Sequence, residues 1–495
     1  MSERRIAAVT LGAIVLLGLA LRLYHVRAPI LDHPAWRQGD QAAISRNFAQ
    51  LQNNIFYPQV DYDGPPPNYI ELELQIMPFC AAQLYRLAGV HVAINRLIVI
   101  AFSLGTIVLL YFFGARLASR RVGLIAALLY AIAPGAVYYG RTLTPDSIMV
   151  FFSTGTLLFW WRWNALRLRA DLVAAIVFGA LAWLAKPPAL LVLVPLIAMS
   201  FAWRGRRAAT DWSLYAFLAT TLVPFALYFN HVRTIAEWHW FSGITAKHVL
   251  PALRAEFSSP AGFLAGLEGS MALLRMLAST VLGPVLFAAA LAGALVLPHS
   301  PTKRQRNWLF ASWAFALLSY AFVVVNVERV DYYLLPWLPL ATLVAAVAID
   351  GVWSRLAPQP LAARAWAALG AVLFIATYAN MLEIHPYYTW SRRVYASAAE
   401  LNRVLAPDSL IVMGHYGPDV LYLIGRKGWE EDPLLWTVFD MQSAIRKGAR
   451  YFIAVEPARL RVNKELYVYL QRFAQVPTSS GWPVYDLSMA MKPAF

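Results

Sequence analysis

The sequence predicts a polytopic α-helical membrane protein that ends in a small α/β domain. Three observations indicate this fold class: 59% of the residues are hydrophobic, only 14% are charged, and apolar runs recur from residue 6 to residue 382. An ordinary soluble domain is roughly a quarter charged. So few charges could not cover a soluble chain of 495 residues, so the bilayer must be the solvent for most of it.

The apolar runs predict about eleven transmembrane helices, because each is about 17–25 residues long or consists of two shorter runs. The expected spans are 6–27, 94–114, 122–139, 147–163, 171–185, 188–203, 212–230, 271–297, 307–325, 333–350 and 363–382. The first run is too long for a signal peptide and no clear small-residue cleavage site follows it, so we expect it to be a retained span.

The net charge of +15 indicates the orientation of the chain rather than a nucleic-acid partner. Basic clusters fall in every second gap between the predicted spans, which places them all on one side. These clusters are Arg4 and Arg5; Arg116, Arg120 and Arg121; Arg162, Arg167 and Arg169; Arg204, Arg206 and Arg207; Lys303, Arg304 and Arg306; and Arg355 and Arg364. By the positive-inside rule that side is cytoplasmic. We therefore expect a bacterial inner-membrane protein with a cytoplasmic N-terminus and a periplasmic C-terminus.

The long connections fall on the opposite, periplasmic side, where function usually resides. We expect a transmembrane catalytic domain over 1–383, with a first periplasmic loop over 28–93, and a periplasmic α/β domain over 384–495. In the loop, 41–53 predicts an amphipathic helix at the membrane surface and 69–87 a re-entrant or interfacial helix. In the tail, strands are expected at 409–413, 451–455 and 483–487, with helices between them. The tail has no nucleotide-binding glycine loop.

Cysteine and histidine usage gives no sign of a metal centre. The single cysteine, Cys80, excludes an internal disulfide and a cysteine-based metal site, and we expect it to be a small core residue. His33, His239 and His248 do not show the spacing of a zinc site and are expected on the surface. We therefore expect that the chain needs no cofactor for its activity. A divalent metal is possible, but these residues do not indicate one.

Two aspartates are candidates for acid–base chemistry. Asp40 lies in the segment WRQGD directly before the expected loop helix, where it could also be an N-cap; the two roles are compatible. Asp146 ends the segment YGRTLTPD, which also suits an ordinary helix start with Thr144 as N-cap and Pro145 at N1. Arg141 in the same segment would suit an anionic headgroup.

Further charges lie at the predicted periplasmic ends of spans. Lys186, in the segment AKPP, opposes the positive-inside pattern; it is either a snorkelling turn residue or part of a site. Glu328, Arg329 and Asp331 precede Tyr332, and local salt bridging is the alternative to a functional role.

Four segments resemble the GT-C glycosyltransferases, in the branch that holds the protein O-mannosyltransferases and the bacterial aminoarabinose transferase of lipid A. They are WRQGDQAAISRNF at 36–48, NIFYPQVDYDGPPP at 54–67, YGRTLTPD at 139–146 and ERVDYYLLPWLP at 328–339. The twin short spans around Ala185 are similar as well. The resemblance covers roughly residues 1–385.

This resemblance implies a GT-C fold and inverting transfer of a sugar from a polyprenyl-phosphate donor to a lipid, glycan or protein acceptor. It implies that Asp40 is the general base, that Asp146 is a second acid orienting the acceptor or its own loop, and that cations neutralise the departing phosphate. The expected phosphate-binding residues are Arg141, Lys186 and Arg329. Further expected substrate or metal contacts are Arg37, Glu71, Glu73, Asp331 and Tyr332.

One departure and two alternatives accompany this interpretation. The aminoarabinose transferase has a lysine before its paired prolines, whereas this chain has Asp63-Gly64-Pro65, so that phosphate-binding role is unassigned. A transporter or glycolipid flippase would place ionisable residues near span midpoints, but the charges here lie mostly at span ends. A non-catalytic scaffold role stays open for the tail.

Overall fold

The computed structural model describes residues 2–237, 239–296, 304–356 and 362–490. The chain forms two compact units. The first comprises Met1–Val26, Arg96–His231 and Trp240–Pro386, and the second comprises Arg27–Asn95, Val232–His239 and Tyr387–Phe495. The loop that follows the first helix thus groups with the tail.

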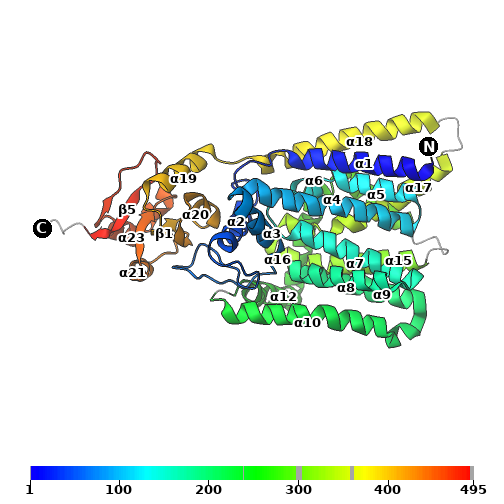
Figure 1. Ribbon diagram of the computed structural model, residues 1–495, viewed down its shortest axis with the longest axis horizontal. Helices are drawn as coiled ribbons and strands as arrows, with labels where there is room; N and C mark the ends of the chain where they lie inside the picture. The colour runs from blue at the N-terminus through cyan, green and yellow to red at the C-terminus, as the bar shows by residue number, and fades with distance from the viewer. Residues whose placement is uncertain (1, 238, 297–303, 357–361, 491–495) are drawn as a thin grey trace. The chain divides into compact units, whose positions relative to one another are not determined.

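The first unit is a bundle of apolar helices that lie roughly side by side (Figure 1). Its N-terminal half contains α1 (Glu3–Leu23), α4 (Val92–Leu117), α5 (Arg120–Ile132), α6 (Pro134–Tyr138), α7 (Asp146–Leu166), α8 (Arg169–Ala185), η1 (Pro187–Val192), α9 (Leu193–Arg204), η2 (Gly205–Thr210) and α10 (Trp212–Ile235). Its C-terminal half contains α11 (Trp240–Ile244), η3 (Thr245–Val249), α12 (Leu250–Ser258), α13 (Pro260–Met276), η4 (Leu277–Val281), α14 (Pro284–Val296), α15 (Arg304–Tyr320), η7 (Ala321–Val325), α16 (Asn326–Glu328), η8 (Asp331–Leu334), α17 (Trp337–Leu356) and α18 (Ala362–Ile384).

The predicted class, a polytopic helical membrane protein, is confirmed, but the count of eleven spans is not. Among the described residues, seven helices are long and apolar enough to cross a membrane. Others are shorter: α5 and α14 have 13 residues each and α8 has 17. The predicted span 271–297 is wrong, because the chain turns between η4 and α14. Gly283 adopts a φ of 76° there and Pro284 begins the next helix.

The second unit combines the loop helices α2 (Ala35–Gln50) and α3 (Ile76–Ala88) with the tail domain. The tail follows η9 (His385–Tyr388) and contains α19 (Arg392–Val404), β1 (Leu410–Gly414), α20 (Pro418–Ile424), β2 (Lys427–Glu431), α21 (Val438–Arg446), β3 (Ala449–Ile453), α22 (Pro457–Val462), α23 (Lys464–Leu470), β4 (Phe473–Gln475) and β5 (Val484–Ala490). The expected α/β character and three predicted strands are confirmed as β1, β3 and β5.

The tail sheet has the strand order β2-β1-β3-β5-β4. Strand β1 is parallel to β2 and β3, and β5 is antiparallel to β3 and β4. Buried side chains from β1, β3, β5 and the helices form its core, among them Val412, Met441, Phe452, Leu466 and Tyr485. The sequence of β2, KGWEE, is too polar to be recognised as a strand, which is typical of a sheet edge.

Loop one covers this polar edge. The backbone N–H of Gly428 donates to the carbonyl of Asp61 at 2.9 Å, and that of Gly64 donates to the carbonyl of Gly428 at 2.7 Å. The edge that β2 would leave open is therefore hydrogen-bonded, which explains why the loop and the tail form one compact unit.

Three sequence-based expectations need correction here. The helix predicted at 41–53 begins at Ala35, and ten of its sixteen residues are buried against α3 and α20, so it is not a surface helix. Asp40 consequently lies inside α2, whose N-cap is Pro34. Thr144 is not the N-cap of α7 either, since Pro145 occupies that position. Cys80 is exposed on α3 rather than buried.

Candidate functional site

Asp146 and Lys186 form a buried ion pair in the first unit. Asp146 begins α7 and Lys186 follows the last residue of α8, and the Lys186 Nζ lies 2.6 Å from the Asp146 Oδ1. The ammonium also lies 5.0 Å from the ring centre of Tyr332 and 4.5 Å from that of Tyr333. The buried ammonium is therefore held between one carboxylate and two aromatic faces.

A hydrogen bond and a ring contact of Tyr139 link this ion pair to η8. The Tyr139 hydroxyl donates to the Asp331 Oδ1 at 2.6 Å, and the ring of Tyr139 packs edge-on against that of Tyr332 at 5.9 Å. The carbonyl of Tyr139 accepts a hydrogen bond from Ser147, the residue after Asp146. The YGRTLTPD and ERVDYYLLPWLP segments, 190 or so residues apart in the chain, therefore meet in one cluster.

The two predicted arginines behave differently. Arg141 is fully buried, with its guanidinium 5.0 Å from the ring centre of Tyr138. Arg329 is exposed; it ends α16 in a left-handed conformation and its Nε donates to the carbonyl of Asn326 at 3.0 Å. Glu328 faces His248 at 3.5 Å. The predicted charged residues Glu328, Arg329 and Asp331 therefore contact different neighbours. Of the three, Asp331 belongs to the cluster around Lys186.

The first unit also contains an apolar cavity of about 1050 Å³. Its walls come from α9, α13, η4, α14, α15, η7, η8 and α17, and they are almost entirely hydrocarbon and aromatic. Leu334, the last residue of η8, lines the cavity. Leu334 directly follows Tyr333, whose ring centre lies 4.5 Å from the Lys186 ammonium.

Asp40 occupies a different environment, in the second unit. It is fully buried in α2, and the nearest cation, the Nη1 of Arg37 one turn earlier, is 3.6 Å from its Oδ2. Neither carboxylate oxygen has a hydrogen-bond partner within normal geometry among the described residues, although the Tyr62 hydroxyl lies nearby. Burial raises the pKa of Asp40 to about 7, against the opposing effect of Arg37.

Further acids lie near Asp40, and one of them, Glu430, comes from the tail, which was not expected to contribute. Burial, together with Glu237 and Glu431, raises the pKa of Asp63 to about 7. Burial also raises the pKa of Glu430, on β2, to about 9, with Asp40 and Asp63 adding to the effect. The Glu430 Oε2 accepts the backbone N–H of Gly417 at 2.7 Å. Sequence reasoning missed Glu430 because β2 itself was not recognised.

The remaining predicted loop residues lie around Arg37. Its Nη2 donates to the Glu73 Oε1 at 2.5 Å, so Arg37 connects Glu73 with Asp40. Gln75 donates to the carbonyl of Glu73 at 2.7 Å and holds the segment before α3. Glu71 is buried, with its Oε2 3.8 Å from the Nδ1 of His239. The structure therefore brings Arg37, Asp40 and Glu73 together and places Glu71 beside a histidine.

Asp61, by contrast, is fully paired. Its Oδ1 accepts from Lys427 at 2.7 Å and from Asn47 at 3.0 Å, and its Oδ2 accepts from Arg46. Although burial opposes ionisation, Arg46 and Lys427 hold the pKa of Asp61 below its ordinary value. This group joins α2, loop one and β2, and it is structural in character.

Gly39 allows α2 to approach the tail domain very closely. A Cβ added there would lie 2.6 Å from the backbone N of Asp419 and 2.8 Å from its Cα. Only a residue without a side chain permits this backbone-to-backbone packing of α2 against α20, immediately before Asp40.

No group of three or more His, Cys, Asp or Glu side chains with the arrangement of a metal site occurs among the described residues.

The fold is that of the GT-C membrane glycosyltransferases, as the resemblance in the sequence implied. The sequence model of the family described as dolichyl-phosphate-mannose-protein mannosyltransferase matches residues 76–229. No curated protein sequence is significantly similar to the chain.

Two solved proteins illustrate the likeness. ArnT from Cupriavidus metallidurans bound to undecaprenyl phosphate is 15% identical with a TM-score of 0.59, over 97% of this chain and 98% of that one. The oligosaccharyltransferase AglB from Archaeoglobus fulgidus, in complex with an inhibitory peptide and a dolichol-phosphate, is 13% identical with a TM-score of 0.62, over 98% of this chain and 74% of that one. This chain is a multi-pass membrane protein related to these enzymes in fold.

Proposed function

We propose that the chain is a glycosyltransferase that moves a sugar from a polyprenyl-phosphate donor to a lipid, glycan or protein acceptor at the periplasmic face of the bacterial inner membrane. The observation that carries this proposal is Asp40, a carboxyl that is fully buried in α2 beside Arg37 and whose pKa burial raises to about 7. A general base works best when its pKa lies near the working pH.

The first unit supports the choice of donor. A polyprenyl phosphate has a long apolar chain and an anionic head, and the unit has both a large apolar cavity, lined in part by Leu334 of η8, and a buried ammonium, Lys186, beside Tyr333 of the same helix. In this proposal the chain occupies the cavity and Lys186 neutralises the phosphate, with Asp146 positioning Lys186 through their 2.6 Å ion pair. ArnT and AglB, the similar proteins, were solved with a polyprenyl phosphate and a dolichol-phosphate respectively.

The second unit supports the choice of base. Ionised Asp40 would accept the proton of the acceptor hydroxyl or amine as that group attacks the anomeric carbon. The bond between that carbon and the phosphate oxygen breaks, and the lipid phosphate leaves with its electron pair on oxygen. Attack opposite the leaving phosphate inverts the anomeric configuration. Arg37, 3.6 Å from Asp40, keeps part of the carboxyl population ionised near neutral pH.

The test is sugar transfer by the purified full-length chain in proteoliposomes, with a panel of polyprenyl-phosphate sugars as donors. Asp40→Asn should lower the transfer rate by about 10²–10⁴-fold, because it replaces the proposed base by an amide side chain of nearly the same size. The exposed Asp408→Asn is the matched control and should keep full activity. Both variants should stay folded, which a single cooperative thermal unfolding transition would show. Undiminished transfer by Asp40→Asn would contradict the assigned base, and sugar-independent lipid transport would contradict the proposed enzyme.

A further inference from the structure

An open pocket of about 870 Å³ lies in the first unit, where α7 and α9 end and α10 begins. Its lining includes three arginines, Arg167, Arg204 and Arg207, and three tryptophans, Trp163, Trp203 and Trp212. These residues belong to the basic gaps that predict the cytoplasmic side, so the pocket is no part of the chemistry proposed for the outer face.

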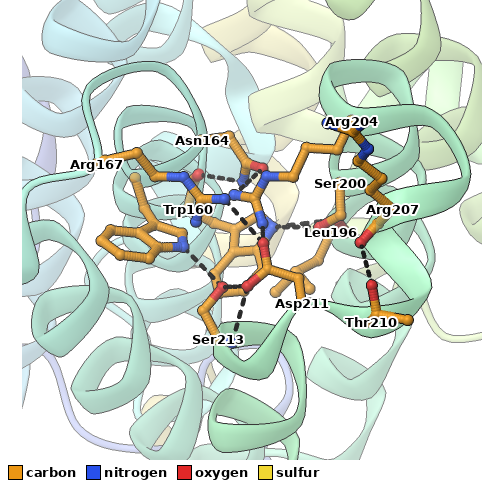
Figure 2. A network of polar contacts seen from close by, with 11 residues as sticks. Trp160, Asn164, Arg167, Leu196, Ser200, Arg204, Arg207, Thr210, Asp211 and Ser213 are labelled. Atoms are coloured by element: carbon orange, nitrogen blue, oxygen red, sulfur yellow. Dashed lines mark hydrogen bonds and ion pairs between the residues drawn. The ribbon is translucent and has the colours of Figure 1, made fainter.

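The pocket carries more positive charge than its own side chains neutralise. Its one carboxylate is Asp211, whose Oδ2 accepts from the Arg167 Nη2 at 2.8 Å and also pairs with Arg204 (Figure 2). The Oδ1 of Asp211 is used by the backbone N–H and hydroxyl of Ser213, at 2.9 Å and 2.6 Å. Three arginines and one aspartate line the pocket, which leaves it with a formal charge of +2 and favours an anionic ligand.

Two of the three arginines, Arg167 and Arg204, are held in place. The Nη2 of Arg204 donates to the Asn164 Oδ1 at 3.0 Å, and the Asn164 amide in turn donates to the carbonyl of Trp160 at 2.8 Å (Figure 2). The Arg167 guanidinium lies 4.7 Å from the ring centre of Trp163. Fixed guanidinium groups lose little entropy when they bind a phosphate, and their fork geometry suits its oxygens.

The rim of the pocket indicates what kind of phosphate would bind. Trp163 and Trp212 pack edge to face at 6.3 Å, and Trp212 is 64% exposed. Leu166, Leu168 and Tyr215 are large apolar side chains that are also exposed nearby in the chain. Tryptophans beside exposed hydrocarbon are typical of the boundary between headgroups and acyl chains. A water-soluble phosphate would gain nothing from this rim, whereas a phospholipid would place its chains along it.

We infer that this pocket binds the phosphate of an anionic phospholipid from the leaflet at the basic end of the bundle. Its phosphodiester would contact Arg204 and Arg207, and its glycerol and first methylenes would lie against the tryptophans. The inference does not depend on the proposed transferase activity.

The test is native mass spectrometry of the purified full-length chain, titrated with phosphatidylglycerol, phosphatidylcholine or inorganic phosphate. Phosphatidylglycerol should be retained in preference to phosphatidylcholine, and excess inorganic phosphate should not displace it. Arg207→Gln should weaken phosphatidylglycerol binding about fivefold. The matched control is Arg206→Gln, an exposed neighbour in η2 that does not line the pocket, and it should bind like the parent.

Each contrary result overturns the inference. Equal binding of the two lipids, or equal losses in Arg206→Gln and Arg207→Gln, would mean a diffuse surface attraction. Inorganic phosphate binding that requires Arg207, without phosphatidylglycerol binding, would assign the pocket to a soluble anion. Trp212→Ala further distinguishes a phospholipid from free phosphate as the ligand, because it should weaken phosphatidylglycerol binding and leave inorganic phosphate binding unchanged.

Discussion

Two buried aspartates, Asp146 in the first unit and Asp40 in the second, show how differently one residue type can be used. Asp146 has an ammonium 2.6 Å away, whereas the nearest cation to Asp40 is 3.6 Å away and its other charged neighbours include Asp63 and Glu73. A close countercharge keeps a buried carboxylate ionised and its partner in place, while acidic neighbours keep a carboxyl near the point of protonation. The first arrangement suits the holding of a cation, and the second suits proton transfer.

The largest effect is expected at Lys186. Lys186→Met would leave the Asp146 carboxylate buried without its ammonium, which should destabilise the first unit by about 3–5 kcal/mol and abolish donor binding. Thermal unfolding and binding of a polyprenyl phosphate measure the two effects. The double variant Lys186→Met with Asp146→Asn should recover stability without recovering donor binding. If the double variant also bound donor normally, Lys186 would have no part in phosphate recognition.

A smaller loss of stability is expected at Asp61, the paired acid of the second unit. Asp61→Asn leaves Arg46 and Lys427 without their carboxylate and should cost about 2–3 kcal/mol, since both cations keep some contact with water. Because the folded pKa of Asp61 is lowered, its contribution is present above its ordinary pKa and is lost as the pH falls through the folded value. Unfolding measured from pH 7 down to pH 3 should show this loss in the parent and little of it in Asp61→Asn.

Asp40 should show the opposite dependence on pH. Its pKa is raised from 3.8 to about 7, so its stabilising contribution is complete below 3.8 and is lost as the pH rises through about 7. At pH 8 the Asp40→Asn variant should therefore be more stable than the parent, by as much as roughly 4 kcal/mol. The transfer rate of the parent should rise over the same interval, as the base ionises. Flat profiles of rate and stability between pH 5.5 and 8.5 would show that Asp40 does not titrate there.

The smallest effect is expected at Arg37. Its guanidinium favours the ionised form of Asp40, so Arg37→Gln should raise the pKa of that carboxyl and move the midpoint of the rate profile upward by about half to one pH unit. At alkaline pH, where Asp40 is fully ionised, the rate of Arg37→Gln should approach that of the parent. A uniform loss at every pH would instead indicate that Arg37 contacts substrate.

Apolar periodicity was enough to predict most of the helical bundle and the central strands of the tail, because burial against hydrocarbon determines both. It failed where a single local feature decides the outcome. Gly283 and Pro284 break one expected span, and the polar edge strand β2 carries no apolar alternation. The segments around Asp146, Lys186 and Tyr332 were recognisable because their charges interrupt apolar runs. Glu430 was not, because its proximity to Asp40 arises from pairing between loop one and β2.

The contact at Gly39 links the tail to the helix turn that bears Asp40, the proposed base. With no atom to spare between α2 and α20, any tilt of the tail domain must move the helix turn that bears Asp40. A chain cut before residue 387 would lose the support of this turn, so in the proposed transferase the tail is part of the scaffold that holds the base.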